Sequence, residues 1–284
     1  MQNSPGSDFR VDALDIKLDG KSRELREIVL MALEGGGRGH LGPALSLLEI
    51  LRALYENVLH HDPAKPTLES RDRFILSKGH GVLGLYSVLA SQGYFDQSEL
   101  VDFCKYDSRF PGHPEVGQVP GIEFSTGSLG HGLPVAVGVA AAARIKNQKW
   151  RTFVLIGDGE MAEGSIWEGA LHAAKHRLGS LQVIVDYNMM QASGDIRNVL
   201  PLGNILDKWR AFGFEVDEVN GHDVEAITEC LSKPFHPEGQ PKFLLAHTIK
   251  GKGFAEAENS TRWHHKAKIS PSELANLRIS DVNR

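Results

Sequence analysis

Short apolar runs alternate with longer amphipathic stretches along most of the 284-residue chain. Apolar runs that predict buried strands lie at 73–76, 152–156, 181–186 and 243–248, with a more polar, edge-like strand at 215–219. Stretches that predict helices lie at 25–33, 83–92, 133–146, 163–177, 205–212 and 224–231. A further helix is predicted to open at Pro43, with Leu47, Leu48, Leu51 and Leu54 on one face, and Asp223 can cap the helix at 224–231.

This alternation favours an α/β fold: a doubly wound, mostly parallel sheet with helices on both faces. No repeat or low-complexity linker divides the chain. We therefore expect one domain over 1–284, with a polar N-terminal extension at about 1–20 and a C-terminal loop and tail at about 250–284.

Composition narrows the class of protein. Apolar residues make up 41% and charged residues 24%, which is ordinary for a soluble protein, and the net charge of −5 argues against nucleic acid as a partner. Two cysteines suit a reducing compartment, the start lacks the apolar core of a signal peptide, and the small-apolar run at 133–143 is too short to span a bilayer. We expect a cytoplasmic protein without a membrane partner.

The candidate chemistry centres on Gly157-Asp158-Gly159, which ends one predicted strand, and on Asn188, which follows the next. A strand, helix and strand within about thirty residues form a βαβ unit, so both residues fall at the carboxyl ends of parallel strands, where such sheets bind ligands. Carboxylate and amide oxygens suit Mg²⁺ or Ca²⁺. A diphosphate held by a metal ion is the first hypothesis, and Asp186 is left out of the metal ligands.

Three further signals lie at predicted element ends. Histidines stand in glycine turns at Gly39-His40, Gly79-His80 and Gly112-His113-Pro114, either as structural residues or as donors and proton carriers. A glycine-rich turn at 126–132 precedes a helix and can admit an anion. The basic stretches at 250–253 and 262–266 are either a solvated tail or a segment that folds over an anionic ligand. Glu160 is accounted for by the preference for acids in a first helical turn.

Taken in order, these segments resemble a known family. Gly157-Asp158-Gly159 with Asp186-Tyr187-Asn188 resembles the thiamine diphosphate motif, and the chain from about 25 to 266 is similar to the N-terminal, diphosphate-binding half of a transketolase. The supporting segments are 39–42, 73–80, 111–115 and 125–130.

The resemblance implies thiamine diphosphate and Mg²⁺, with Ca²⁺ or Mn²⁺ as alternative ions, and assigns residue roles. The implied metal ligands are Asp158, Asn188 and the backbone carbonyl of Met190. The implied cofactor contacts are His80, Gly127, Leu129, Gly159, Glu163, Asn188 and His264, with Glu163 and Glu168 near a subunit interface. The implied catalytic residues are His40, His113 and His264, and His265 competes with His264 for its role.

The implied activity is two-carbon ketol transfer from a ketose, or ketose phosphate, to an aldose. The pyrimidine-binding domain of the family has no counterpart in this sequence, so we expect a second polypeptide to supply it, in a heterotetramer. The alternatives are a subunit of a deoxyxylulose-phosphate synthase or 2-oxo acid dehydrogenase, or a non-catalytic, cofactor-binding regulatory subunit. A nicotinamide enzyme is disfavoured because no Gly-x-Gly-x-x-Gly follows a strand.

Overall fold

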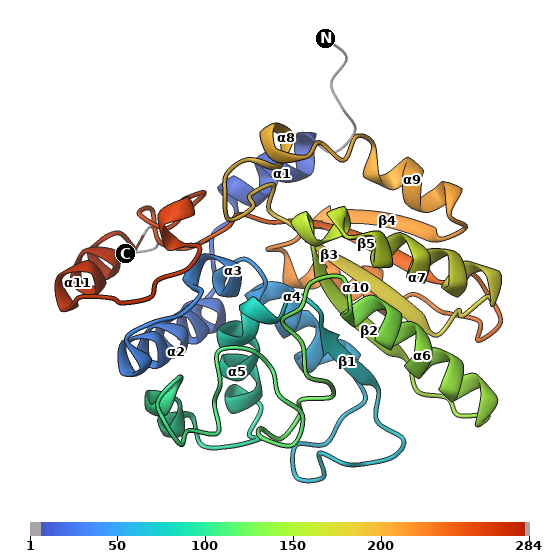
Figure 1. The fold of residues 1–284 in the computed structure, drawn as a ribbon, viewed down its shortest axis with the longest axis horizontal. Coiled ribbons are helices and arrows are strands. Elements are labelled where there is room, and N and C mark those ends of the chain that lie inside the picture. Colours follow the sequence, from blue (N-terminus) through green and yellow to red (C-terminus); the bar gives the residue numbers. More distant parts are fainter. Residues whose placement is uncertain (1–6, 282–284) are drawn as a thin grey trace.

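A computed structural model describes residues 7–281 and contains one five-stranded parallel sheet (Figure 1). The strands are β1 (Arg73–Leu76), β2 (Thr152–Gly157), β3 (Leu181–Tyr187), β4 (Glu215–Asn220) and β5 (Lys242–His247), in the order β1-β2-β3-β5-β4. Every neighbouring pair is parallel, and β4 lies at an edge. The predicted fold class is confirmed, including the edge position of the most polar strand.

The inner strands β2, β3 and β5 bury both of their faces, so the sheet separates two apolar cores. Along β2, Phe153 and Leu155 point into one core, whereas Val154 and Ile156 point into the other. The first core is closed by α2 (Gly20–Gly36), α3 (Leu41–Leu45), α4 (Leu48–Arg52), α5 (Val82–Ser91) and α10 (Val224–Ser232). The second is closed by α6 (Gly132–Ile145), α7 (Gly164–Lys175) and α9 (Ile205–Ala211). Helices therefore cover both faces of the sheet, as predicted.

Local signals in the sequence explain several helix ends. The Asp19 side chain accepts a hydrogen bond from the Ser22 amide at 2.7 Å and caps α2, which ends at Gly37 with φ 64°. Asp223 caps α10 through the Ala226 amide at 3.0 Å, as predicted. The remaining short elements are η2 (Gly79–Gly81), η3 (Gln97–Asp102), η4 (Gly159–Ala162), α8 (Ile196–Val199) and η5 (Thr261–Trp263).

The segment after Pro43 differs from the single amphipathic helix expected there. The first helix begins at Leu41, so Pro43 lies inside it and does not open it, and the segment is broken into α3, α4 and a π-helical turn, η1 (Ala53–Val58). Leu47, Leu48, Leu51 and Leu54 are all fully buried, so this segment has no solvent face over most of its length. A helix packed on all sides shows no amphipathic period, and the four leucines gave a misleading impression of one face.

Both chain ends depart from the polar extensions that were expected. Residues 7–15 form α1 (Ser7–Asp15), and α11 (Pro271–Ile279) lies near the other end, opened by a capping box of Ser270 and Glu273. Lys250 and Lys252 are buried, so the first part of the expected tail belongs to the folded domain. Residues 1–6 and 282–284 of the two expected extensions lie outside the described residues.

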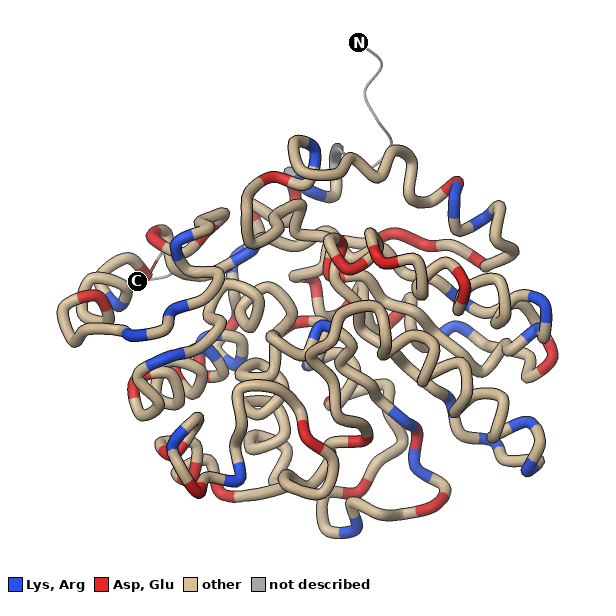
Figure 2. Tube along the Cα trace, in the orientation of Figure 1, with Lys and Arg blue, Asp and Glu red and all other residues tan. Residues whose placement is uncertain are grey.

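Acidic and basic residues are interspersed along the trace (Figure 2). In the described part of the chain, no helix is both long enough and apolar enough to cross a membrane.

Candidate active site at the carboxyl edge of the sheet

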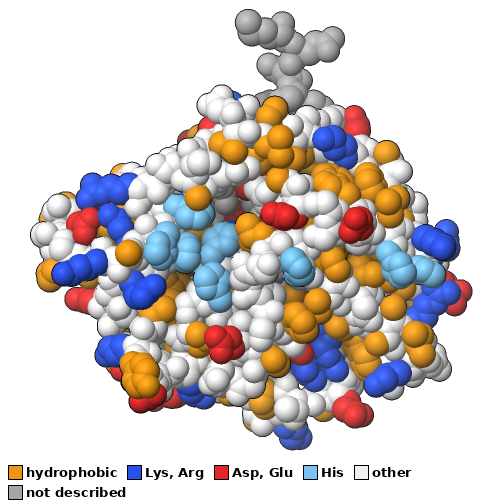
Figure 3. Space-filling model, in the orientation of Figure 1, with side chains coloured by type: hydrophobic (Ala, Val, Ile, Leu, Met, Phe, Trp, Pro, Cys, Tyr) orange, Lys and Arg blue, Asp and Glu red, His pale blue; other side chains and the backbone are white. Residues whose placement is uncertain are grey.

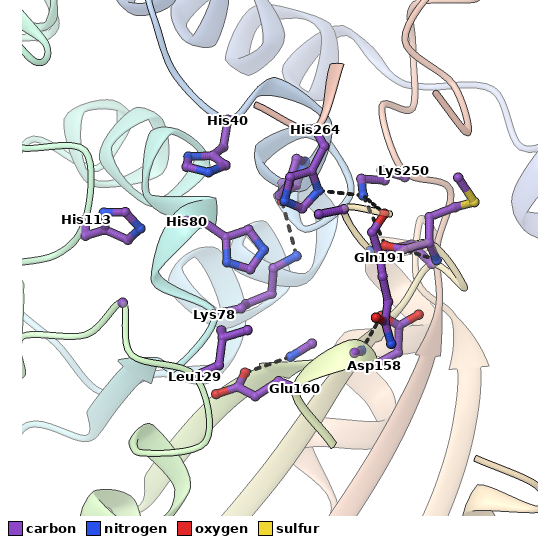
Figure 4. A pocket seen from close by; sticks show the side chains of 17 residues that line it. His40, Lys78, His80, His113, Leu129, Asp158, Glu160, Gln191, Lys250 and His264 are labelled. Carbon is purple, nitrogen blue, oxygen red and sulfur yellow. Dashed lines mark hydrogen bonds between the residues drawn. The ribbon is translucent and has the colours of Figure 1, made fainter. Parts of the chain in front are cut away.

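The two strand ends singled out in the sequence meet at one cavity of about 340 Å³. Gly157 pairs in register with Asp186, so Asp158 and Asn188 leave adjacent strands at the same edge. Asp158, Asn188, Met190 and the predicted residues His40, His80, His113, Gly127, Leu129, Gly159 and His264 all line this cavity. Figure 4 shows His40, His80 and His113 on one side and Asp158 and Gln191 on the other.

Asp158 is a buried carboxylate without an ion pair among the described residues. Its oxygens accept hydrogen bonds from the Gly159 amide at 2.7 Å and the Met189 amide at 2.5 Å. Burial, reinforced by the nearby charge of Asp186, raises the pKa of Asp158 to about 6. A bound cation would offset the cost of burying the negative charge and would favour the charged carboxylate.

The other two candidate metal ligands lie in the turn that follows β3. Asn188 Oδ1 accepts from the Met190 amide at 3.0 Å, and Met189 adopts the left-handed conformation with φ 62°. The Met190 carbonyl accepts from Lys250 Nζ at 3.0 Å, which leaves the second lone pair of this oxygen for a metal ion.

The donor set fits a hard cation. It combines one carboxylate, one amide oxygen and one backbone carbonyl, which is the kind of oxygen set that Mg²⁺ takes together with ligand oxygens and water. The described residues hold no cluster of three or more His, Cys, Asp or Glu side chains able to bind a metal ion. A metal here would therefore depend on amide, carbonyl and ligand oxygens.

The imidazoles of the three glycine turns lie together, although the turns are far apart in the chain. The His40 ring centroid lies 5.6 Å from that of His80 and 5.7 Å from that of His113. It also lies 5.6 Å from the His264 ring and 4.4 Å from the His265 ring. In Figure 3 several pale blue histidine side chains gather in one patch on the left of the face shown, and others lie apart from it.

The imidazoles of His40, His80, His113 and His264 are held in the neutral form. Burial, with the neighbouring histidines and Lys250, lowers the pKa of His40 to about 3. Burial, with Lys250 and Lys78, lowers the pKa of His264 to about 3. The pKa values of His80 and His113 are also lowered, chiefly by burial. At neutral pH each ring can therefore both donate and accept one hydrogen bond.

Lys250 fixes the ring of His264. Its Nζ donates to His264 Nδ1 at 2.7 Å and to the Met190 and Gln191 carbonyls at 3.0 and 3.2 Å. An ammonium group can only donate, so Nδ1 of His264 accepts and Nε2 carries the proton of the neutral ring. Burial lowers the pKa of Lys250 to about 8, which leaves it mostly charged at pH 7.

The glycine-rich turn before α6 closes the cavity against His113. Gly127 has φ 144°, and a Cβ atom there would lie 3.0 Å from the His113 ring. The Thr126 hydroxyl donates to the Leu76 carbonyl at 2.6 Å and ties the turn to the end of β1. A side chain at residue 127 would be disfavoured by both the backbone conformation and the imidazole.

Glu160 corrects the sequence interpretation, which assigned it only a place in a first helical turn. It lies in η4, lines the cavity and is 2% exposed. Its carboxylate accepts from the Ser77 hydroxyl and from the Gly130 and Gly157 amides, the last two at 2.8 and 3.0 Å. Because Ser77 is 83 residues away from Glu160 along the chain, no local pattern indicated that Glu160 would be buried and hydrogen-bonded at the cavity.

Lys78 and Gln191 also line the cavity and were not predicted as site residues, and so does Lys250, from a stretch that was expected to be either a solvated tail or a segment over an anionic ligand. Lys78 is buried and its Nζ contacts Asp186 Oδ2. Burial alone would raise the pKa of Asp186, but Lys78 and further hydrogen bonds hold it below its ordinary value. The exclusion of Asp186 from the metal ligands agrees with this pairing.

Glu163 and Glu168 are exposed and do not line the cavity. Glu163 is the residue that precedes α7, and its contact with the cofactor stays a prediction. A place for both residues at a subunit interface stays a prediction.

A buried polar network supports the segment that carries Lys250. Glu49 accepts from Arg26 at 2.7 Å and from His222 Nδ1 at 2.7 Å. The Ile249 amide donates to His222 Nε2 at 2.9 Å, and Arg26 Nε donates to the Lys252 carbonyl at 2.8 Å. Through His222 and Arg26, both ends of the 249–252 segment are thus linked to the Glu49 carboxylate.

Comparison with known proteins identifies the class. The transketolase, thiamine diphosphate binding domain family matches residues 21–280. This chain belongs to that family.

Two relatives and one solved structure show how the chain compares within it. It is 42% identical over 267 residues to one of the subunits of the apulose-4-phosphate transketolase of Actinobacillus succinogenes, covering 93% of this chain and 96% of that relative. It is 38% identical to the 6-deoxy-6-sulfo-D-fructose transketolase subunit SqwG of a Clostridium species, covering 88% and 91% of the two chains. The solved transketolase from Leishmania mexicana superimposes with a TM-score of 0.82 at 29% identity, over 93% of this chain and 41% of that one.

Proposed function

We propose that the chain is the diphosphate-binding subunit of a two-chain transketolase that transfers a two-carbon ketol unit from a ketose to an aldose. The observation that carries the proposal is the cavity itself. Neutral imidazoles from four separate segments face a buried, unpaired carboxylate at the carboxyl edge of a parallel sheet. The apulose-4-phosphate transketolase relatives, each a single subunit matched over nearly its whole length, support the two-chain arrangement.

Asp158, Asn188 and the Met190 carbonyl would hold Mg²⁺, and the metal ion would hold the diphosphate. Lys250 and His264, which lie beside these oxygens, would contact the phosphate oxygens together with His80 and Gly159. When bound, thiamine diphosphate supplies the nucleophilic carbon and the electron sink for ketol transfer.

The imidazoles would orient the sugar and move protons. His40 and His113 would donate hydrogen bonds to the oxygens of the ketose, which stabilises negative charge as it develops. Nε2 of His264 carries a proton and can donate to the reacting groups. Because their pKa values are lowered, the rings would remain neutral at physiological pH and could accept a proton only transiently.

A second polypeptide would bind the aminopyrimidine ring and complete the site, and two copies of each subunit would form a heterotetramer. The chain spans 41% of the Leishmania transketolase, which is consistent with the rest of the active site residing elsewhere. A cytoplasmic location also stays a prediction.

The test is reconstitution. The purified chain is mixed with a candidate partner that carries a pyrimidine-binding domain, together with thiamine diphosphate, Mg²⁺, a ketose donor and an aldose. We expect ketol transfer only in the mixture, and a loss of about 10²–10⁴-fold in kcat on His113→Gln with assembly retained.

Other outcomes point to other functions. Robust turnover by the chain alone would overturn the two-chain proposal. Turnover of pyruvate or another 2-oxo acid in place of the ketose would indicate one of the other thiamine diphosphate enzymes. A mixture that assembles but responds to no substituted histidine would indicate a regulatory subunit.

A further inference from the structure

A second hollow of about 380 Å³ adjoins the cavity and shares His40 and His113 with it. The residues that line it without lining the cavity include Arg38, Lys105 and His265, with Cys104 and Ser108. Its described lining residues include two cationic side chains and no carboxylate. A substrate that reaches His40 and His113 from outside therefore meets a basic surface before it meets the cavity.

The position of Arg38 follows from the backbone. Gly39 and Lys266 form an isolated antiparallel bridge, with amide-to-carbonyl distances of 2.9 Å in both directions. In extended chain, the side chains of the residues just before and just after a bridged residue lie on the face opposite to that of the bridged residue. Arg38 and His40 thus share one face, together with His265, whose ring lies 4.4 Å from that of His40.

Arg38 is free to bind a ligand. It is exposed, and it makes no ion pair or side-chain hydrogen bond among residues 7–281. Lys105 is exposed too, but its Nζ lies 3.0 Å from Asp102 Oδ1, which partly neutralises its charge. The guanidinium is therefore the main uncompensated charge of the hollow, and its planar fork suits a tetrahedral oxyanion.

We propose that this hollow binds the anionic terminal group of the sugar substrate, a phosphate or a sulfonate, with Arg38 as the specificity-determining residue and His265 in the lining of the same hollow. The inference rests on the proposed function, because His40 and His113 set where the sugar lies. It adds a site on this subunit for the terminal group of the sugar.

The kinetic test uses the assembled complex and three ketose donors, which end in a phosphate, a sulfonate or an uncharged hydroxymethyl group. Arg38→Gln should raise KM roughly tenfold for the charged donors and leave the uncharged donor within about twofold. Arg38→Lys should show a smaller rise in KM for the charged donors than Arg38→Gln. Lys146→Gln, which removes an exposed charge at the end of α6, should leave KM unchanged for charged and uncharged donors. A larger effect on the phosphate or on the sulfonate donor identifies which anion the hollow accepts. An equal loss for charged and uncharged donors would overturn the inference.

A binding test separates this inference from the proposed function. The full chain is titrated with inorganic phosphate while the histidine side-chain resonances are followed by NMR. The His265 and His40 signals should shift in the wild type and shift much less in Arg38→Gln. If the assembled complex transfers no ketol unit, the proposed function fails, and this titration alone decides the anion site. No phosphate response, or the same response in Arg38→Gln, would overturn it.

Discussion

Asp158 and Lys250 face the same cavity, and burial weakens the charge of each. The pKa of the carboxyl rises to about 6 and that of the ammonium falls to about 8, mainly because both groups are removed from water. The two groups are not paired with one another, since Lys250 donates instead to His264 and to two carbonyls. A ligand that brings a cation to Asp158 and an anion to Lys250 would stabilise both charges.

Asp158→Asn keeps the shape of the side chain but removes the charge that a metal ion would meet. We expect Mg²⁺ affinity in the presence of thiamine diphosphate to fall by at least about 10–100-fold, the usual range for the loss of outer-shell partners. Titration calorimetry on the full chain measures this, with Glu229→Gln on α10 as an exposed control outside the cavity. An unchanged Mg²⁺ affinity in Asp158→Asn would remove this residue from the metal ligands.

His40 makes stability depend on pH. Its folded-state pKa of about 3 lies below the unfolded value near 6.5, so the unfolded chain binds more protons between these pH values. The stabilising contribution of the neutral ring is complete above about pH 6.5 and is lost as pH falls toward 3. We therefore expect His40→Gln to reduce the decline in the free energy of unfolding as pH is lowered from 7 to 4.5.

Urea unfolding at several pH values measures this decline, and His236→Gln, at an exposed histidine, serves as the control. A decline in His40→Gln as steep as that of the wild type would show that the His40 ring is not protected from protonation in the folded chain.

At the scale of elements, the segment that leaves β5 depends on contacts made far away in the sequence. Arg26 on α2, Glu49 on α4 and His222 before α10 hold residues 249 and 252 from one side. From another side, Arg10 on α1 donates to the Thr248 carbonyl at 3.1 Å. Lys250 therefore reaches the cavity from a backbone fixed by several helices.

Glu49→Gln should destabilise the fold because it leaves Arg26 buried without its counter-charge. We expect a loss of about 3–5 kcal/mol in the free energy of unfolding, the usual result of removing one partner of a buried ion pair. Glu24→Gln, which breaks the exposed pair with Lys21, should cost about 0–1 kcal/mol and provides the matched control.

Hydrogen exchange at the Ile249 amide gives a local measure of the same change. The exchange should accelerate in Glu49→Gln, because the amide keeps only one acceptor oxygen for which Arg26 and His222 would compete. Equal stability losses in Glu49→Gln and Glu24→Gln would show that the buried network contributes no more to stability than an exposed ion pair.

At the scale of the whole molecule, the sheet separates two cores, and the cavity opens where the loops of the sheet's carboxyl edge meet. The site lies across segments from residue 40 to residue 264, so a ligand that contacts all of them ties together distant parts of the chain. Such a ligand binds only the folded chain and stabilises it by mass action.

Thiamine diphosphate with Mg²⁺ should therefore raise the stability of the isolated chain. At a free cofactor concentration one hundred times Kd the gain is about 2.7 kcal/mol, seen as an increase in Tm by calorimetry. Thiamine with Mg²⁺, which lacks the diphosphate, should give a much smaller gain. Equal effects of the two compounds would argue against diphosphate recognition by this chain.

Much of the framework could be predicted from the sequence because it depends on local patterns. Four apolar runs and one more polar, edge-like segment predicted the strands, the alternation with helices predicted the parallel sheet, and Asp223 predicted a helix cap. The position of Asp158 and Asn188 followed from the βαβ unit, since parallel strands end at a common edge.

Other features were decided only when distant segments packed together. The sequence pattern marked Gly157-Asp158-Gly159, Asn188 and three glycine-flanked histidines, and each of these lines the cavity. It gave no indication of the Glu160 hydrogen bonds, the Lys78–Asp186 pair or the burial of Lys250. Backbone propensity and apolar period act between near neighbours and are therefore visible in the sequence. The partner of a buried charge is set by packing across the fold, so only the tertiary structure determines it.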